Sequence, residues 1–358
     1  MDIAMTKFQN QFKLLLVVLV LLGLLGAVAV AQKTVETKKL AQTGMKFLQV
    51  GSSGRQTAMA DAFTAAEGYS ASMFYNPAGM ARLNATADLS FGQTKWIADI
   101  KHLCGSMAYN LGDLGVFGFS AQYVDYGDIE QTILVDKTIS SQGFIDLGTF
   151  KPWAAALGVG YARALSDKFS VGGSVKWVKQ DLGDSYVQVA TIVKDVNQAD
   201  SVTGTTQKNA QSVLAFDFGV MYKTGFKSLV FGMAVRNFSK EVTYQKESFQ
   251  LPLTFKMGLS MNILDIAEID PASQSLLLVV DAEHPRDYPE QIRVGAEYLF
   301  AQMVALRIGY VSPSDEHNLS YGLGLQQAWF GTQLAVDYSY TPFGVFDAVQ
   351  RISLRFGF

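Results

Sequence analysis

From about residue 86 to the last residue, apolar side chains alternate with polar or small ones, and this period of two constrains the fold most. Between residues 169 and 177, Phe, Val, Gly, Val and Trp alternate with Ser, Gly, Ser and Lys. The same pattern recurs at residues 214–222, 253–262 and 304–310. Successive side chains of a strand point to opposite faces, so each segment presents one apolar face and one polar or tightly packed face.

About fourteen such segments of about 9–13 residues follow one another, close to the length with which a tilted strand crosses a bilayer. An even number is what a closed bacterial barrel requires. Charged residues make up only 17% of the chain, against about 25% in soluble domains. The sequence therefore predicts an all-β fold, a transmembrane antiparallel β-barrel of about 14 strands over residues 84–358. The segments centre near residues 92, 105, 119, 157, 174, 217, 233, 256, 279, 294, 307, 323, 335 and 353.

The lengths of the connections predict how the barrel is oriented. If the first strand rises from the periplasm, the two longest connections, residues 125–149 and 182–211, lie outside the cell. Most periplasmic connections are short, although residues 263–273 form an exception that the pattern does not explain. Long outer loops and short periplasmic turns are typical of outer-membrane barrels.

The N-terminus predicts export. Lys7 and Lys13 precede an apolar run from residue 14 to residue 31, which ends in Ala29-Val30-Ala31. A basic start, an apolar middle and a small-x-small end are typical of a secretory signal peptide, here residues 1–31. The length of the run leaves an uncleaved transmembrane anchor as the alternative. We expect the bacterial outer membrane as the destination.

Between the signal segment and the strands, residues 32–83 are predicted to form an N-terminal arm and a hatch inside the barrel. Small and apolar residues at 57–66 favour a short helix. A hatch turn formed by Asn76, Pro77 and Gly79 then follows, because Pro77 disfavours helical geometry at Asn76 and Gly79 permits a positive φ. The alternative is a plain helix stop outside the barrel.

Charged residues at strand positions are predicted to face the lumen, since Arg or Lys facing lipid at mid-bilayer would cost about 2–4 kcal/mol. Both signs are present, so the charges can pair with one another. We favour a structural ion-pair network that holds the hatch over a polar pore or ligand path. The predicted network consists of Asp217, Arg236, Lys256, Asp281, Arg293, Glu297, Arg307, Asp337, Arg351 and Arg355.

No motif indicates catalysis, a metal site or a cofactor. His102, His284 and His317 lie far apart and lack metal-ligand spacing. Cys104 is the only cysteine, so no intrachain disulfide forms, and we interpret it as a small apolar strand residue. A net charge of −3 provides no basic excess for nucleic acid. We expect no enzyme; a barrel enzyme with a dispersed Ser/His/Asp site is the alternative left open.

Several motifs resemble the PorV/PorQ family, whose members are relatives of the FadL long-chain fatty-acid transporters. The clearest are Gly54-Arg55, Ala58-Met59, Asp61-Ala62-Phe63-Thr64-Ala65 and the run Tyr75-Asn76-Pro77-Ala78-Gly79-Met80-Ala81. Residues 293–298, 305–310 and 337–344 are also similar, so the resemblance spans most of the chain after the signal segment. Ala60, where the family usually has glycine, and Glu67-Gly68-Tyr69 depart from the family pattern.

The resemblance implies a fourteen-stranded outer-membrane barrel with a hatch in its lumen. In this family PorV receives the C-terminal β-domain of type IX secretion cargo and shuttles the cargo to a cell-surface sortase. The implied partners are secreted cargo β-domains and secretion-system proteins, in contact with outer-membrane lipid. The alternative is a FadL-like channel that takes up a hydrophobic ligand. The charged lumen and long outer loops favour the shuttle.

Overall fold

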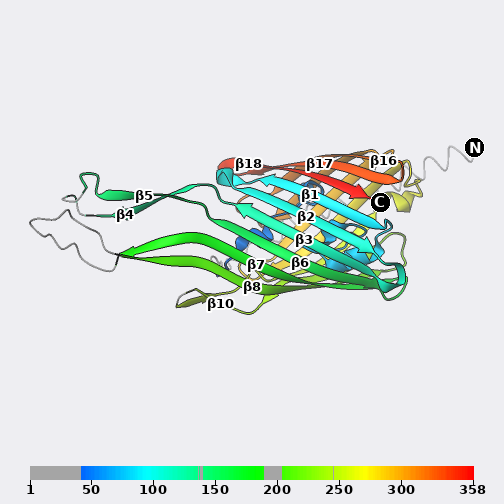
Figure 1. The fold of residues 1–358 in the computed structure, drawn as a ribbon. Coiled ribbons are helices and arrows are strands. Elements are labelled where there is room, and N and C mark those ends of the chain that lie inside the picture. The colour runs from blue at the N-terminus through cyan, green and yellow to red at the C-terminus, as the bar shows by residue number, and fades with distance from the viewer. Residues whose placement is uncertain (1–41, 136, 138–139, 189–203, 245) are drawn as a thin grey trace, which may run out of the picture.

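A computed structural model describes residues 42–358 except 136, 138–139, 189–203 and 245. The predicted signal segment and residues 32–41 of the arm lie outside the described residues. Fourteen antiparallel strands form a closed barrel (Figure 1), as the sequence predicts. The strands are β1 (Ala87–Lys95), β2 (Lys101–Asn110), β3 (Val116–Asp125), β6 (Trp153–Ala164), β7 (Phe169–Gln188), β8 (Gly204–Lys223), β9 (Val230–Ser239), β12 (Thr254–Asn262), β13 (Gln274–Pro285), β14 (Gln291–Phe300), β15 (Val304–Ser312), β16 (Leu319–Trp329), β17 (Thr332–Phe343) and β18 (Phe346–Gly357).

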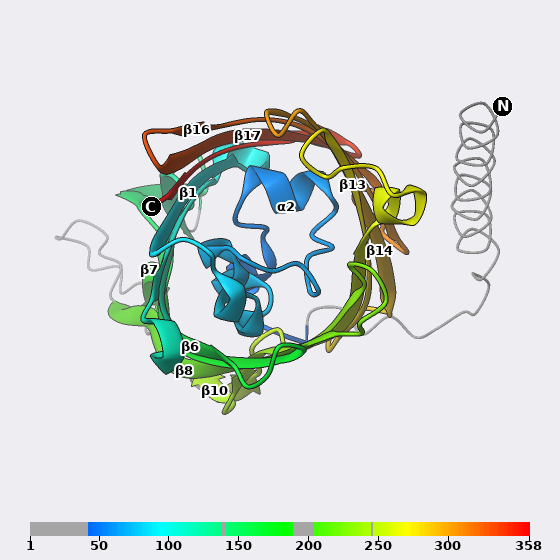
Figure 2. The same cartoon turned by 90° about the vertical axis from the view of Figure 1, so that its right-hand side faces the viewer.

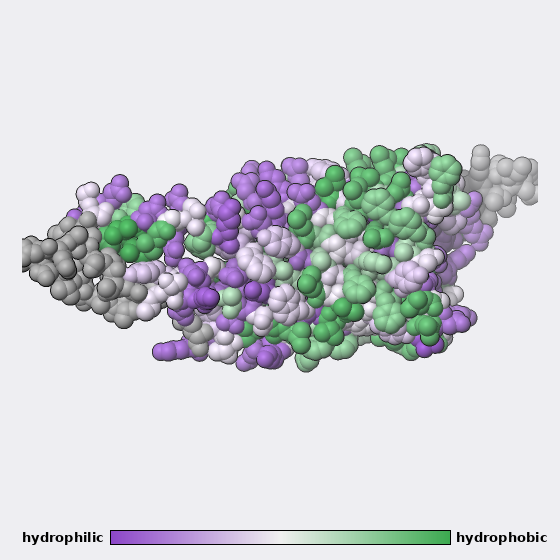
Figure 3. All heavy atoms as spheres, in the orientation of Figure 1, coloured by the Kyte–Doolittle hydropathy of each residue, from purple (hydrophilic) through white to green (hydrophobic). Residues whose placement is uncertain are grey.

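Each expected segment centre falls within one of these strands, and β1 closes the barrel against β18, with Asp88 opposite Gly357. Burial follows the predicted period of two. In β15, Leu306 and Ile308 point outward and are about half exposed, whereas Arg307 between them is buried. The outward apolar side chains form a broad belt around the barrel (Figure 3). This belt is the surface that an outer-membrane barrel turns toward lipid.

The helices of the described residues are short, and none of them combines the length and apolar character needed to cross a membrane. The connections contain η4 (Ile97–Asp99), η5 (Gly112–Leu114) and η6 (Ile263–Ala267). The long connection 263–273, unexplained by the sequence pattern, contains η6, which buries Leu264 and Ala267.

The two ends of the barrel differ. One end has short turns and the C-terminus, and we call it the periplasmic end. The other, the outer end, carries an extension of strands beyond the barrel (Figure 1). The extension comprises the outer halves of β7 and β8 and two separate hairpins, β4 (Ile129–Leu134) with β5 (Phe144–Phe150) and β10 (Val242–Tyr244) with β11 (Glu247–Phe249).

The extension corrects one expectation, because residues 125–149 and 182–211 are not wholly loops. Residues 129–134, 144–150, 182–188 and 204–211 are strands. These stretches contain Ile, Thr, Val and Tyr and no proline, which favours extended pairing. The β7–β8 ladder therefore continues beyond the barrel wall.

The hatch lies inside the ring of strands (Figure 2). It consists of η1 (Lys46–Gln49), α2 (Gly54–Ala58), η2 (Ser70–Phe74) and η3 (Pro77–Arg82). The predicted helix over 57–66 is wrong: α2 ends at Ala58, and Ala60 and Asp61 have φ of 55° and 59°. The backbone at this point lies against the wall, because a Cβ at Gly309 would overlap the backbone of Met59 and Ala60. The tight contact leaves no room for the helix to continue.

The hatch turn also differs from the expectation. Asn76 and Pro77 do not stop a helix but begin one, η3, with Asn76 in an extended conformation as its N-cap. Gly79 is not among the glycines with positive φ. A glycine fits here for another reason, since a Cβ would lie 2.7 Å from Ser72 Oγ and 2.9 Å from the Ala66 carbonyl oxygen.

Candidate functional site

One attachment between hatch and wall is a largely buried charge cluster centred on Glu297 of β14. Arg55 of α2 donates from Nε and Nη2 to the two carboxylate oxygens of Glu297, each at 2.7 Å. Arg307 of β15 donates to Glu297 at 2.5 Å and to Asp337 of β17 at 2.7 Å. Paired, bidentate contacts of this kind are the strong class of charge-assisted hydrogen bonds. We call these four residues the Glu297 cluster.

Two further wall carboxylates bind the hatch backbone. Asp281 of β13 is fully buried and accepts from the backbone N–H groups of Phe63 and Thr64, at 2.9 and 3.0 Å, and from Thr64 Oγ1. Asp88 of β1 accepts from the Ser70 N–H at 2.8 Å and from Arg355 Nε of β18 at 2.6 Å. Hydrogen bonds to a charged acceptor are each worth about 1.5–3 kcal/mol, so these contacts fix the path of the hatch.

Aromatic packing reinforces the same attachments. The Tyr69 ring of the hatch lies between two guanidinium groups, Arg55 at 4.4 Å and Arg355 at 4.1 Å from the ring centroid. Cation–π contacts of this geometry add attraction when they are shielded from water. Tyr69 therefore links the Glu297 cluster to the Asp88–Arg355 pair.

The remaining predicted charges form separate groups toward the outer end. Glu283 of β13 pairs with Arg293 at 2.6 Å and with Lys256 at 3.0 Å. Asp217 of β8 pairs with Lys176 of β7 at 2.8 Å. Two arginines contact the lumen lining in other ways: Arg236 donates to the Leu48 carbonyl at 3.4 Å, and Arg351 donates to Thr341 Oγ1 at 3.2 Å.

The structure thus places all ten predicted charges on inward positions of barrel strands but divides them among several groups. The sequence prediction missed Arg55, Asp88, Lys176, Glu283 and Tyr69. Asp88, Lys176 and Glu283 occupy inward positions of their strands, so the alternation could have identified them. Arg55 and Tyr69 lie in the irregular hatch, where no periodicity marks the direction of a side chain.

Asn76 of the hatch turn is fully buried against the wall. Its Nδ2 donates to the carbonyl oxygens of Thr64 and Val220, at 2.8 and 3.2 Å, and its Oδ1 accepts from the Ala78 N–H at 3.1 Å. One side chain therefore joins two hatch segments to β8. A Cβ at Gly219 would overlap this amide, so glycine in the wall makes room for it.

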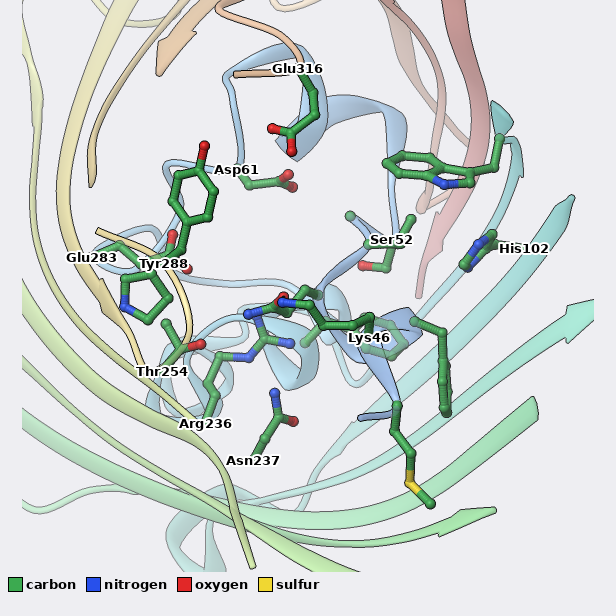
Figure 4. Close-up of a pocket in the computed structure, with 18 of the residues that line it drawn as sticks. Lys46, Ser52, Asp61, His102, Arg236, Asn237, Thr254, Glu283, Tyr288 and Glu316 are labelled. Atoms are coloured by element: carbon green, nitrogen blue, oxygen red, sulfur yellow. The ribbon is translucent and has the colours of Figure 1, made fainter. Parts of the chain in front are cut away.

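A cavity of about 660 Å³, the vestibule, lies at the outer end above the hatch (Figure 4). Part of its lining is polar: Tyr75 Oη donates to Asp61 at 2.8 Å, and Arg236 lies 5.8 Å from the Tyr75 ring centroid. On another side, Trp96 packs edge-on against Phe343 at 5.0 Å, and His317 stacks on Phe343 at 4.9 Å. The vestibule therefore offers both apolar and charged surface.

Two side chains of the outer connections that line the vestibule, His317 and Tyr288, have pKa values shifted toward their neutral forms. Burial, together with the nearby Arg293 charge, lowers the pKa of His317 from 6.5 to about 4. Burial and a hydrogen bond to Asp315 raise the pKa of Tyr288 from 10.0 to about 12. The folded state therefore disfavours a charge on either ring.

A second cavity of about 450 Å³ lies at the periplasmic end, lined by Glu67, Tyr69, Arg355 and the C-terminal Phe358 among others. It shares no lining residue with the vestibule. The fully buried hatch side chains Met59, Phe63 and Met80 fill the lumen between wall strands. The hatch therefore separates an outer cavity from a periplasmic one.

The fourteen-stranded barrel, its apolar belt and the hatch in its lumen define a barrel of the outer-membrane type. Residues 147–349, more than half of the chain, match the family model described as type IX secretion system membrane protein PorP/SprF. The chain belongs to this family. None of the curated proteins compared with the chain matches it.

Solved structures with a similar fold include channels and transporters for hydrocarbons. The CymD monoaromatic hydrocarbon channel is 12% identical with a TM-score of 0.53, over 86% of this chain and 98% of that one. The Pseudomonas putida toluene transporter TodX is 12% identical with a TM-score of 0.50, over 89% and 98%. A Pseudomonas aeruginosa FadL homologue is 12% identical with a TM-score of 0.48, over 85% and 97%. At 12% identity, the similarity to CymD and TodX shows the fold alone.

Proposed function

We propose that this barrel binds proteins secreted through the type IX system at its outer end, and that its hatch keeps the lumen closed while it does so. The family match supports the system in which it acts. The PorV/PorQ resemblance of residues 75–81 supports a cargo-shuttling role within that system, in which the C-terminal β-domain of the cargo is the ligand.

The observation that supports this proposal is the contrast between the lumen and the outer extension of the barrel. The hatch is held in the lumen by the Glu297 cluster and by the Asp88 and Asp281 contacts, whose carboxylates are buried. The outer extension instead projects strands and hairpins beyond the barrel, where a protein has access (Figure 1). A lumen filled by a hatch and an outer end with projecting strands and hairpins are better suited to binding a protein than to forming a channel.

Deleting residues 183–209 tests the proposal. We expect the variant to retain the heat-modifiable gel shift of a folded barrel, because the deletion lies beyond the wall, and to lose binding of a purified cargo C-terminal β-domain. Binding is measured with detergent-solubilised protein. Unchanged binding by the deletion variant would place the cargo site elsewhere on the barrel.

A second candidate function is uptake of a hydrophobic small molecule, and the vestibule favours it. Phe47, Phe74, Ile97, Ile100 and Phe343 contribute apolar surface to a cavity of adequate size. Extraction of lipid from the purified protein distinguishes the two functions. A tightly retained fatty acid, with no cargo domain bound, would favour the FadL-like alternative.

A further inference from the structure

Arg236 of β9 is a lumen cation that no carboxylate of the described residues pairs with. It lines the vestibule, and within that part of the chain its one hydrogen bond runs from Nη2 to the Leu48 carbonyl oxygen at 3.4 Å. Its Nε is buried and has no partner there. A guanidinium group carries several N–H donors, so the protein uses little of the hydrogen-bonding capacity of Arg236.

The carboxylates of the neighbouring ion-pair groups are bound to other cations. Asp217 pairs with Lys176 at 2.8 Å and also accepts from the N–H of Asn237, the residue that follows Arg236. Glu283 pairs with two cations of its own, one on β12 and one on β14. Together with Arg236, these groups contain four cations and two carboxylates. This side of the lumen therefore has an excess of positive charge.

The acidic residues that line the rest of the vestibule do not supply the missing partner. Asp61 accepts from Tyr75 Oη at 2.8 Å, whereas the Arg236 guanidinium group lies 5.8 Å from the centroid of the same ring. Figure 4 shows Arg236 at one side of the cavity and Asp61 and Glu316 toward the other. A guanidinium group in this position favours an anion that enters the vestibule.

Apolar side chains complete the cavity around this cation. Phe47 and Phe74 of the hatch and Ile97, Ile100 and Phe343 of the outer rim line the same space of about 660 Å³. Apolar walls with a few convergent polar groups are typical of ligand sites of this size. A carboxylate matches the fork of donors on a guanidinium group. The ligand chemistry is therefore a carboxylate attached to an apolar body.

We propose that the vestibule receives the C-terminal end of a secreted β-domain, with Arg236 bound to its terminal carboxylate. The inference rests on the proposed function and specifies where the end of the cargo lies. A domain at the C-terminus of a protein ends in an α-carboxylate, and the vestibule lies at the outer end, where the cargo binds. The carboxylate supplies the charge that Arg236 lacks, and the last apolar side chains of the cargo pack against Phe47 and Phe74.

Amidation of the cargo tests the ligand group without changing the barrel. The probes are a purified cargo C-terminal β-domain with a free terminal carboxylate and the same domain ending in a carboxamide. We expect the wild-type barrel to bind the amidated domain about 10- to 100-fold more weakly, the range for loss of hydrogen bonds to a charged group. Equal affinities overturn the inference while the proposed function stands. Failure of both domains to bind overturns both.

Arg236→Met tests which residue binds the carboxylate. The variant should bind the free-acid domain as weakly as the wild type binds the amide, and amidation should then have no further effect. Arg351→Met is the matched control, because Arg351 is a buried lumen arginine that does not line the vestibule. In this control, amidation should weaken binding as in the wild type. A full effect of amidation in Arg236→Met overturns the assignment to Arg236.

A fatty acid is the other source of a carboxylate on an apolar body, and isotope-labelled laurate distinguishes the two. We expect the wild-type barrel to retain no laurate through gel filtration. Laurate retention that Arg236→Met abolishes, together with equal binding of the two cargo domains, would assign the vestibule to uptake of a small molecule and overturn the inference.

Discussion

At the residue scale, most of the lumen charges are paired because they are buried. A charge in a protein interior is tolerated only when opposite charges and hydrogen bonds replace its water, and Glu297 has two guanidinium partners for this purpose. Asp281 achieves the same result with backbone N–H groups and a hydroxyl. These contacts support the interpretation of the lumen charges as attachments of the hatch.

Replacing Arg55 with Met should destabilise the hatch by about 3 kcal/mol, because it removes the bidentate partner of Glu297 and leaves a buried carboxylate less well compensated. The free energy of unfolding in guanidinium, measured in phospholipid vesicles, checks the loss. Arg55→Lys should also destabilise the protein, since an ammonium group does not reproduce the two parallel hydrogen bonds.

The exposed pair Lys95–Asp99, with its charged atoms 3.8 Å apart, provides the control. Lys95→Met should change the free energy of unfolding by less than about 1 kcal/mol, as for other surface pairs. If Arg55→Met and Lys95→Met had the same small effect, the Glu297 cluster would not anchor the hatch.

At the scale of elements, the hatch fits because glycines on inward strand positions allow its backbone to approach the wall. A Cβ at Gly172 would lie 2.6 Å from the Ala78 nitrogen, and one at Gly309 would overlap the backbone of Met59 and Ala60. The alternation of the strands was evident in the sequence. The role of these inward glycines was not evident in the sequence, because it depends on which hatch residue lies opposite each of them.

Gly309→Val should displace the hatch without opening the barrel wall. The added side chain has no space against the hatch backbone, and overpacking of this kind typically costs about 1–3 kcal/mol. We expect faster cleavage of residues 54–83 by added protease, with the heat-modifiable gel shift retained.

Gly105→Val is the matched control, since a Cβ at Gly105 meets Phe91 only at an ordinary 3.6 Å. Its hatch should be cleaved at the wild-type rate. Equal cleavage rates for the two variants would contradict a close fit between hatch and wall.

At the scale of the whole molecule, the hatch and barrel form a single closed body with separate cavities at its two ends. The protein should therefore pass no steady ion current in a planar bilayer, whereas a variant lacking residues 54–83 should form a water-filled pore. Single-channel recording measures both. A steady current through the wild-type protein would show that the hatch leaves a continuous path.

Much of the fold was predictable because it depends on local patterns. The period of two places each strand, assigns one face to lipid and the other to the lumen, and thereby locates charges such as Arg307 and Asp337 inside the barrel. The hatch was predicted as a segment, but its helix was misplaced. The contact of Met59 and Ala60 with the wall at Gly309 overrides the helical propensity of residues 57–66, so α2 ends at Ala58.

The sequence by itself determined the number of strands, the direction of their side chains and the existence of an inserted hatch, since each is encoded within a few neighbouring residues. Only the tertiary structure decided which charges pair and how the lumen is divided. Those features depend on residues far apart in the chain, such as Arg55 and Glu297, separated by 242 positions. Closure of the barrel brings such residues together, and no local sequence pattern predicts which of them become neighbours.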